Sequence, residues 1–355
     1  MIDHLSWRAV FFINLPLAAA VIAIALRHVP ESRDAEVQGK LDWPGALLVT
    51  LGLGGVVYGL IESSNAGWSH PRILASLLVG VAALAAFVAV EIRLESPMMP
   101  TRLFRSSTFT GANLLTFLLY GALGGSLFFV PLNLVQVQGY STTAAGAAML
   151  PLILLLSALS RWSGGLVDRF GAKQPLVIGP AIAAGGFALF AIPGVGGSYW
   201  LTFLPAVVVL GLGMSISVAP LTTTVMNSVD ASFSGAASGI NNAASRVASL
   251  LAVALFGLIM TSMFNRTLHS QLEQAAVAPQ VIEVVERQRE KLGGIELPES
   301  IDAAHKASAR QAITKAFVTG FRAIMLICAA LAVASAASAW VLIGASPPSS
   351  SRPDH

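Results

Sequence analysis

The residues of this sequence whose types and spacing suggest chemistry gather first in a short charged connector. Between two long apolar runs lies SGGLVDRFGAK, residues 163–173, which contains Gly164, Asp168, Arg169, Gly171 and Lys173. Gly171 suits a tight turn between two helices because glycine tolerates positive φ. We expect Gly164 to permit close packing of the preceding helix end. Asp168 suits the positive end of a helix dipole, and the basic residues can pair with acidic groups or lipid phosphates.

A second group of candidates consists of polar and aromatic residues inside apolar runs. The residues that we expect to line a cavity are Asn113, Phe117, Tyr120, Phe128, Asn241, Asn242 and Arg246. The first four, with Gly124, recur at spacings that place them on one helical face. Polar groups are costly inside a membrane, and an amide-aromatic face suits a pocket for amphipathic compounds. Simple helix packing for the stripe, and extension of Arg246 toward the lipid headgroups, remain alternatives.

The chain lacks the motifs of several functional classes. It contains no His-Glu-x-x-His, no Asp pair within an apolar run, and no glycine-rich loop ending in Gly-Lys-Ser or Gly-Lys-Thr. Its 6 histidines lie in or near connectors, and its one cysteine, Cys328, lies in an apolar run. We therefore expect no enzyme, no metal site, no disulfide and no nucleotide cofactor.

The composition points to a protein that faces lipid. Of 355 residues, 55% are hydrophobic and 11% are charged, and the mean hydropathy is +0.73. Soluble domains carry about 25% charged residues, so this chain could not cover a soluble surface. The net charge of +3 comes from basic residues in connectors, which indicates membrane topology and no nucleic-acid partner.

Nine apolar runs are long enough to span a bilayer as helices. They cover residues 9–26, 43–61, 73–91, 110–134, 143–160, 175–192, 199–220, 240–263 and 318–344. The connector at 265–315 is charged, and Val281, Val284, Val285 and Gln288 show helical spacing, which predicts a short amphipathic helix on the outer face. We expect the tail, residues 346–355, to be disordered.

Lys and Arg in the short connectors predict the orientation. Connectors after the first, third and fifth runs hold nine basic residues, namely Arg27, Arg33, Lys40, Arg93, Arg102, Arg105, Arg161, Arg169 and Lys173. Connectors after the second, fourth and sixth runs hold only Arg72. Because cytoplasmic loops are enriched in Lys and Arg, we expect the N-terminus outside and the C-terminus in the cytoplasm.

Several stretches carry a family resemblance. The spacing from Gly164 to Lys173 resembles the signature connector of the major facilitator superfamily. The stretches SWRAVFFINLPLAAAVIAIALRHVPES, LDWPGALLVTLGLGGVVYGLIE, PMMPTRLFRSSTF and GAASGINNAASRVASLLAVALFG are similar, in order, to its fourteen-helix drug:proton antiporter branch. The chain departs from that pattern at Gln174, and at 248–251, where Ala-Ser-Leu-Leu replaces a Gly pair and predicts looser packing.

The resemblance implies a helix bundle that is incomplete at its N-terminal side. Residues 1–28 would hold its sixth helix, 29–106 two extra central helices and 107–345 the C-terminal six-helix half. Helices one to five of the family pattern would then be absent from this chain. The resemblance suggests that this five-helix portion is a partner. The resemblance also implies that the connector 164–173 gates the transporter.

The function that the resemblance implies is export. A full-length protein of this kind would exchange protons for multidrug or other small organic substrates, by alternating access, in the bacterial plasma membrane. Its partners would be the lipid bilayer and the exported compound, with the proton gradient as energy source. A truncated, non-transporting membrane remnant or accessory subunit remains the alternative.

Overall fold

The computed structural model describes residues 12, 14–28, 42–94, 97, 99–275, 278–299 and 301–344, and its regular elements are helices. By internal contacts the chain forms two units, residues 1–40 and 41–355. The first unit contains α2 (Asn14–His28), which has no buried residue. Arg33, Lys40 and the tail 346–355, which we assigned to connectors and terminus, lie outside the described residues.

Eight helices in the described part of the chain are long and apolar enough to cross a membrane. They are α3 (Trp43–Ala66), α4 (Pro71–Arg93), α5 (Ser107–Gln136), α6 with α7 (Thr142–Ala147 and Leu150–Gly164), α9 (Lys173–Phe190), α11 (Leu204–Asn227), α12 (Ser234–Gln274) and α14 (Ala303–Leu342). The ninth expected span, residues 9–26, overlaps the shorter apolar helix α2 over residues 14–26. The expected all-α membrane fold is confirmed.

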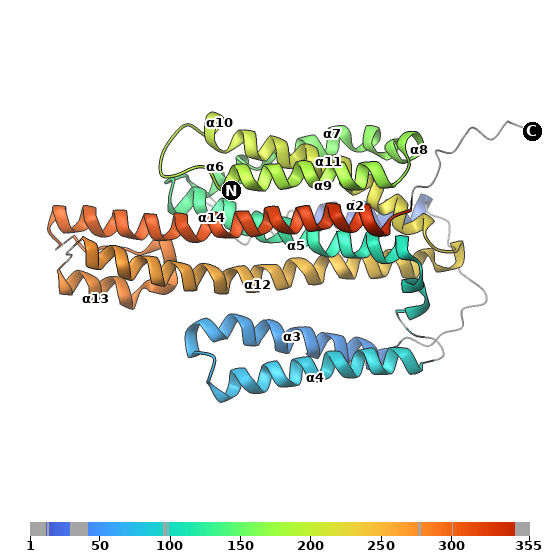
Figure 1. The fold of residues 1–355 in the computed structure, drawn as a ribbon, viewed down its shortest axis with the longest axis horizontal. Coiled ribbons are helices and arrows are strands. Elements are labelled where there is room, and N and C mark those ends of the chain that lie inside the picture. Colours follow the sequence, from blue (N-terminus) through green and yellow to red (C-terminus); the bar gives the residue numbers. More distant parts are fainter. Residues whose placement is uncertain are drawn as a thin grey trace, which may run out of the picture. The chain divides into compact units, whose positions relative to one another are not determined.

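The larger unit is a bundle around α5 and α14. Helix α5 packs against α12 and α14, α9 packs against α11 and α14, and α7 packs against α11 (Figure 1). Phe109, Phe129, Phe187 and Phe317 fill the interior and are at most 1% exposed. Glycines bring backbones close where helices cross, since a Cβ on Gly186 of α9 would lie 2.6 Å from a backbone nitrogen of α11.

Helices α3 and α4 form a hairpin that reaches the bundle through contacts between α3 and α12. Gly55 and Gly80 face each other in this hairpin, and a Cβ on Gly55 would lie 2.8 Å from the carbonyl oxygen of Ser76. The helices pack closely because both positions lack side chains. At the end of α4, the buried carboxylate of Glu91 accepts a hydrogen bond from the Met99 amide at 2.9 Å.

Short helical turns occupy the connectors. They are η1 (Thr101–Arg105), α8 (Leu166–Phe170), α10 (Tyr199–Thr202) and η2 (Ala231–Phe233). The guanidinium of Arg102 in η1 lies 4.1 Å from the ring centroid of Phe233 in η2. The connector before α5 and the connector before α12 therefore meet at the same end of the bundle, joined by a cation–π contact.

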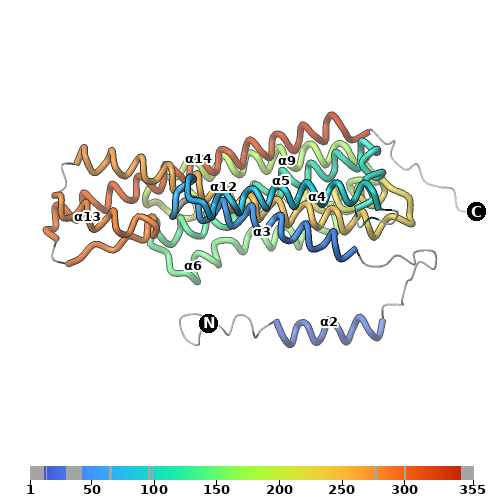
Figure 2. The backbone as a smooth tube through the Cα atoms, turned by 90° about the horizontal axis from the view of Figure 1, so that it is seen from below, coloured from blue at the N-terminus to red at the C-terminus, as the bar shows by residue number. Residues whose placement is uncertain are grey.

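At the opposite end, α12 and α14 continue beyond the limits that hydropathy predicts, 263 and 318, to form a lobe with α13 (Pro279–Arg287) and η3 (Arg289–Gly294) (Figure 2). We call residues 264–317 the α13 lobe. Val281 and Val285 of α13 are buried with Leu272 and Ile313, which gives the lobe an apolar core. The predicted amphipathic helix is confirmed, and the rest of the expected connector is largely helical continuation.

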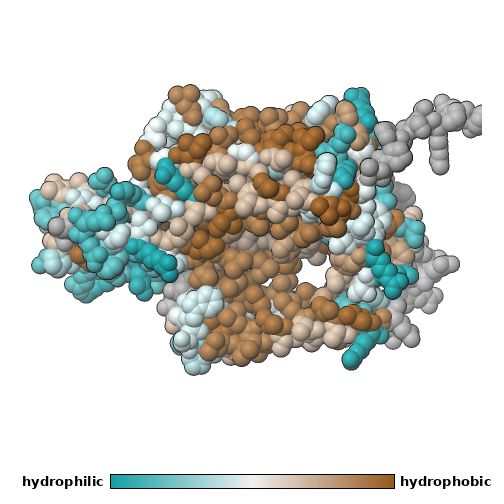
Figure 3. Space-filling model, viewed as in Figure 1, coloured by the Kyte–Doolittle hydropathy of each residue, from teal (hydrophilic) through white to brown (hydrophobic). Residues whose placement is uncertain are grey.

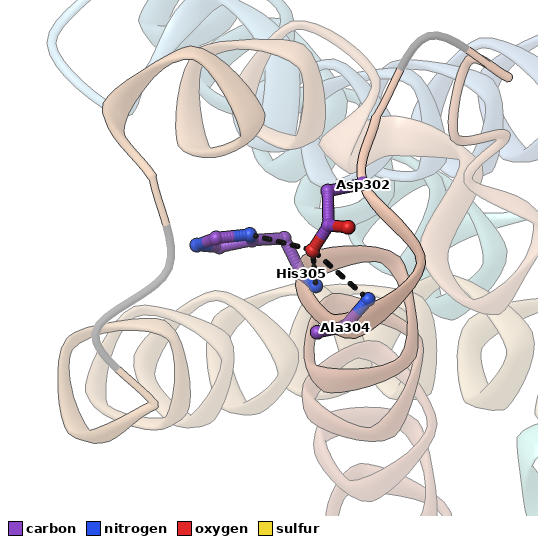
Figure 4. Close-up of polar contacts among 3 residues, drawn as sticks. All are labelled: Asp302, Ala304 and His305. Carbon is purple, nitrogen blue, oxygen red and sulfur yellow. Dashed lines mark hydrogen bonds and ion pairs between the residues drawn. The ribbon is translucent and has the colours of Figure 1, made fainter.

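The first turn of α14 is held by a side-chain cap. The Asp302 carboxylate accepts hydrogen bonds from the backbone amides of Ala304 and His305, at 3.1 and 3.4 Å, and lies 3.2 Å from Nδ1 of His305 (Figure 4). The hydrogen bond to the His305 side chain, followed by those to the amides, holds the pKa of the Asp302 carboxyl below its ordinary value. The cap allows α14 to begin within polar sequence.

The surface of the larger unit has two characters. Hydrophobic residues cover the middle of the helices, whereas hydrophilic residues cover the α13 lobe (Figure 3). Large apolar side chains such as Leu78 and Leu154 are 70% and 64% exposed on this surface. Exposed apolar area on this scale suits contact with lipid acyl chains.

Candidate functional site

A polar cavity lies where α5, α11 and α12 meet, and it has a volume of about 310 Å³. Its lining consists of Tyr120, Thr222, Val225, Met226, Ser238, Asn241, Asn242, Ser245, Arg246 and Ser249. Eight of these ten side chains are polar, whereas most of the buried side chains of the bundle are apolar. Four of the seven residues predicted to line a cavity lie here, on α5 and α12, and α11 forms a third wall.

Asn241 is fixed from behind by α5. Its amide nitrogen donates to Oδ1 of Asn113 at 3.2 Å and to Oγ1 of Thr116 at 2.6 Å. Asn113 in turn donates to the carbonyl of Phe109 at 2.9 Å, and both Asn113 and Thr116 are buried. Asn113 therefore supports the cavity from the second row of side chains, instead of lining it as predicted. Buried amides need such partners to be stable.

The contact between α5 and α12 is close, which corrects our expectation of loose packing at 248–251. A Cβ on Gly124 of α5 would lie 2.6 Å from the Cβ of Ser249, and a Cβ on Gly125 would overlap the ring of Phe256. The Ser249 hydroxyl also lies 3.1 Å from the carbonyl of Tyr120. Glycines on α5 supply the missing volume, so a Gly pair on α12 is not needed.

Several cavity groups keep hydrogen-bonding capacity for a ligand. Arg246 is exposed and makes no hydrogen bond or ion pair with any described residue. The Asn242 amide donates to the carbonyl of Ser238 at 3.0 Å, and its side-chain oxygen accepts from no described residue. The hydroxyl of Ser245 donates to the Asn242 carbonyl at 2.8 Å. The cavity thus offers one guanidinium and several oxygen acceptors, and no carboxylate lines it.

The predicted stripe on α5 does not enter this cavity as a whole. Tyr120 lines it, whereas Phe117 is 38% exposed and is not among the residues that line this cavity. Phe128 is 51% exposed and lines a different hollow, beside Phe129 and Met260. Each residue of an α-helix adds about 1.5 Å of rise along the axis. A long stripe on one face therefore passes more than one neighbouring helix.

Sequence reasoning missed several of the lining residues. Ser238, Ser245 and Ser249 share a face of α12 with Asn241 and Asn242, at helical spacing. That spacing was a usable signal. Thr222 and Thr116 carried none, because their role depends on which helices pack together.

The charged connector folds as the short helix α8 between two turns. Gly171 has φ +74°, which confirms that the turn requires glycine. The expectation for Gly164 is wrong, since a Cβ there would meet nothing within 4 Å and no close packing depends on it. Lys173 begins α9, and its ammonium lies 4.8 Å from the ring centroid of Trp340 on α14. Asp168 and Arg169 are exposed and pair with no described residue.

Comparison with known proteins places this architecture in a family. The sequence profile of the Major Facilitator Superfamily matches residues 1–253. The chain is 28% identical over 347 residues to the tetracenomycin C resistance and export protein of Streptomyces glaucescens, covering 96% of this chain and 63% of that protein.

Two further relatives have similar identity. The multidrug resistance protein Stp of Mycobacterium tuberculosis is 30% identical, covering 79% of this chain and 51% of the relative. The methylenomycin A resistance protein of Bacillus subtilis is 30% identical, covering 73% and 55%. The chain thus spans between about half and two thirds of the length of these relatives. With a profile match over most of its length, it belongs to the Major Facilitator Superfamily.

Proposed function

We propose that the full-length protein exports small organic compounds, including antibiotics, in exchange for protons and by alternating access. The names of its relatives describe resistance to, or export of, tetracenomycin C, methylenomycin A and multiple drugs. These names favour a transporter over an enzyme and over a non-transporting remnant. The proton gradient supplies the energy in this proposal, and no bound cofactor takes part.

The observation that carries the proposal is the polar cavity among α5, α11 and α12. A membrane bundle stabilises itself by apolar packing, and polar side chains within it are costly unless they are paired or functional. Asn113 and Thr116 are buried and hold Asn241 in place, while Arg246 has no described partner. Such a preorganised polar wall with unpaired donors suits reversible binding of an organic compound.

The connector supports a gating role in the same proposal. Asp168 and Arg169 on α8 are exposed without a described partner, so each is available to form an ion pair in another conformation. Lys173 contacts Trp340, which ties the start of α9 to the end of α14 in the conformation described. We propose that exchange of these contacts accompanies the opening and closing of the transporter.

The orientation belongs to the proposal too. Arg102 lies in η1, and Arg93, Arg161 and Lys173 lie in the terminal turns of α4, α7 and α9, at the end of the larger unit where η1 meets η2. A basic end of this kind faces the cytoplasm in bacterial plasma-membrane proteins. The N-terminus is then outside, the C-terminus is cytoplasmic and the α13 lobe faces outward.

A drug-accumulation assay tests the function. The full-length gene product is expressed in an efflux-deficient bacterium, and cellular accumulation of tetracenomycin C, puromycin, lincomycin and ethidium is measured. We expect lower accumulation of at least one compound, restored by a protonophore. A matched pair of variants, Arg246→Gln in the cavity and Arg266→Gln on the same helix outside it, locates the effect. Unchanged accumulation of every compound in well-expressed cells overturns the proposal.

A further inference from the structure

A second hollow lies beside the polar cavity and differs from it in chemistry. It has a volume of about 290 Å³ and lies among α5, α7 and α11. Leu123, Leu156, Met214 and Val218 give it apolar walls. Its buried hydroxyls are used internally, since Ser163 donates to the carbonyl of Ser160 at 3.0 Å and Ser215 to that of Gly211 at 2.7 Å. This apolar hollow therefore offers packing surface with little free hydrogen-bonding capacity.

Tyr120 is the one described residue that lines both hollows. Helix α11 runs along both as well, with Met214 and Val218 facing the apolar hollow and Thr222 and Val225 facing the polar cavity. The two volumes therefore lie side by side along α11, and the half-buried Tyr120 side chain stands at their junction. No hydrogen bond joins its hydroxyl to a described residue.

The position of Tyr120 on α5 is fixed by the close contact between α5 and α12. Its backbone carbonyl lies 3.1 Å from the Ser249 hydroxyl, and Gly121 and Gly124 bring α5 against Ala248 and Ser249 of α12. A Tyr side chain presents an apolar ring and a polar tip, which matches the two environments that it separates.

We propose that the two hollows are parts of one substrate site and that Tyr120 is the partition that determines its specificity. The inference rests on the proposed export function and adds a substrate class to it. The substrate is an amphipathic molecule with a compact apolar ring system in the apolar hollow. Its hydrogen-bonding or anionic group lies in the polar cavity, beside Arg246 and Asn242. Each hollow alone is at the lower limit of about 300 Å³ for ligand pockets, so a drug-sized compound needs both.

Ring size tests the partition. Binding of naphthyl glucoside and of the wider pyrenyl glucoside to the purified full-length protein is measured by probe fluorescence, with naphthalene and methyl glucoside as the separate halves. We expect wild-type protein to bind naphthyl glucoside about tenfold more tightly than either half. Tyr120→Ala removes the partition and raises the affinity for pyrenyl glucoside relative to naphthyl glucoside by a similar factor. Tyr120→Phe keeps the wild-type preference for ring size.

Phe117→Ala is the matched control, because Phe117 is an aromatic residue on the same helix that lines neither hollow. Thermal unfolding checks that each variant is folded, and Tyr120→Leu replaces Tyr120→Ala if the latter does not fold. An unchanged ring preference in folded Tyr120→Ala or Tyr120→Leu, or an equal change in Phe117→Ala, overturns the inference.

Energised efflux of the same glucosides from cells separates this inference from the function. Efflux that is insensitive to Tyr120 substitution contradicts the partition alone, whereas selective binding without any protonophore-sensitive efflux contradicts the export function.

Discussion

Arg246 in the polar cavity and Arg310 in the α13 lobe carry the same guanidinium group in different surroundings. Arg246 contacts no described hydrogen-bond acceptor. Arg310 donates to the carbonyls of Gly293 and Ile295, both at 3.2 Å, and to the carbonyl of Gln136 at 3.5 Å. The lobe uses its polar side chains to satisfy backbone groups where helices end, whereas the cavity leaves some of its polar groups available.

The same contrast extends to other residues at the lobe end. Gln138 accepts from the Gly196 amide and donates to the Gly194 carbonyl, both at 2.8 Å, and Arg322 donates to the carbonyl of Ile192 at 3.1 Å. These bonds fix the loop after α9. Polar side chains at this end therefore have a structural role. In the cavity, by contrast, polar side chains have a ligand-binding role in our proposal.

The largest expected effect comes from the close contact between the glycines of α5 and helix α12, which holds Tyr120 in the cavity wall. Gly125→Ala places a methyl group within the volume of the Phe256 ring, which is only 4% exposed and cannot move away freely. We expect a loss of about 2 kcal/mol in the free energy of unfolding, measured by thermal or denaturant unfolding in detergent. Gly257→Ala is the control, since its Cβ would meet nothing within 4 Å. Equal stability of the two variants would contradict the close contact between α5 and α12.

A substitution in the cavity should separate activity from stability. Arg246→Gln removes the one charge in the lining, and we expect about a tenfold loss in export or binding of a polar substrate. Because Arg246 has no described partner, the free energy of unfolding should change by less than about 0.5 kcal/mol. Arg266→Gln on the same helix should change neither quantity. A destabilised Arg246→Gln protein would show that this arginine is structural after all.

The reverse pattern is expected in the lobe. Arg310→Gln removes hydrogen bonds to three carbonyls on η3, its flank and α5, and should lower the free energy of unfolding by about 1 kcal/mol. Export should stay close to wild type. Lys315→Gln, an exposed lysine on the same helix, provides the baseline for both measurements. If Arg310→Gln stopped export without loss of stability, the division between the two regions would fail.

The smallest expected effect concerns the cap of α14. Because the pKa of the folded Asp302 carboxyl is lowered, the cap stabilises above the unfolded pKa, and this is lost as pH falls through the folded pKa. We therefore expect Asp302→Asn to speed hydrogen exchange at the amides of Ala304 and His305 at neutral pH. Wild type and variant should converge once the pH is below the lowered pKa. A difference independent of pH would contradict a charged cap.

Hydropathy predicted the spans well because about 20 apolar residues suffice to mark a crossing helix. It could not predict that α12 and α14 continue to Gln274 and back to Ala303, because those segments are polar. Their helical state depends on local capping by Asp302 and on packing with Val281 and Val285. A membrane-insertion signal and a helix-forming signal therefore end at different residues.

The candidate site was predicted in part. Tyr120, Asn241, Asn242 and Arg246 meet in one cavity, because each is a polar residue on α5 or α12, the two helices that border this cavity with α11. Phe117 and Phe128 share the face of α5 with Tyr120, but the neighbours of that face change along its length. Periodicity identifies a face, and only tertiary packing identifies what the face meets.

Protection from labelling tests the central claim, that the cavity among α5, α11 and α12 binds the exported compound. In a Cys328→Ser background, the thiol of an Asn242→Cys variant is labelled with N-ethylmaleimide, with and without the antibiotic that the accumulation assay identifies. The control is Ser270→Cys, an exposed position of α12 in the lobe. We predict that saturating antibiotic slows labelling about tenfold at the cavity position and leaves the lobe position unchanged. Equal labelling at the cavity position with and without antibiotic would contradict the account.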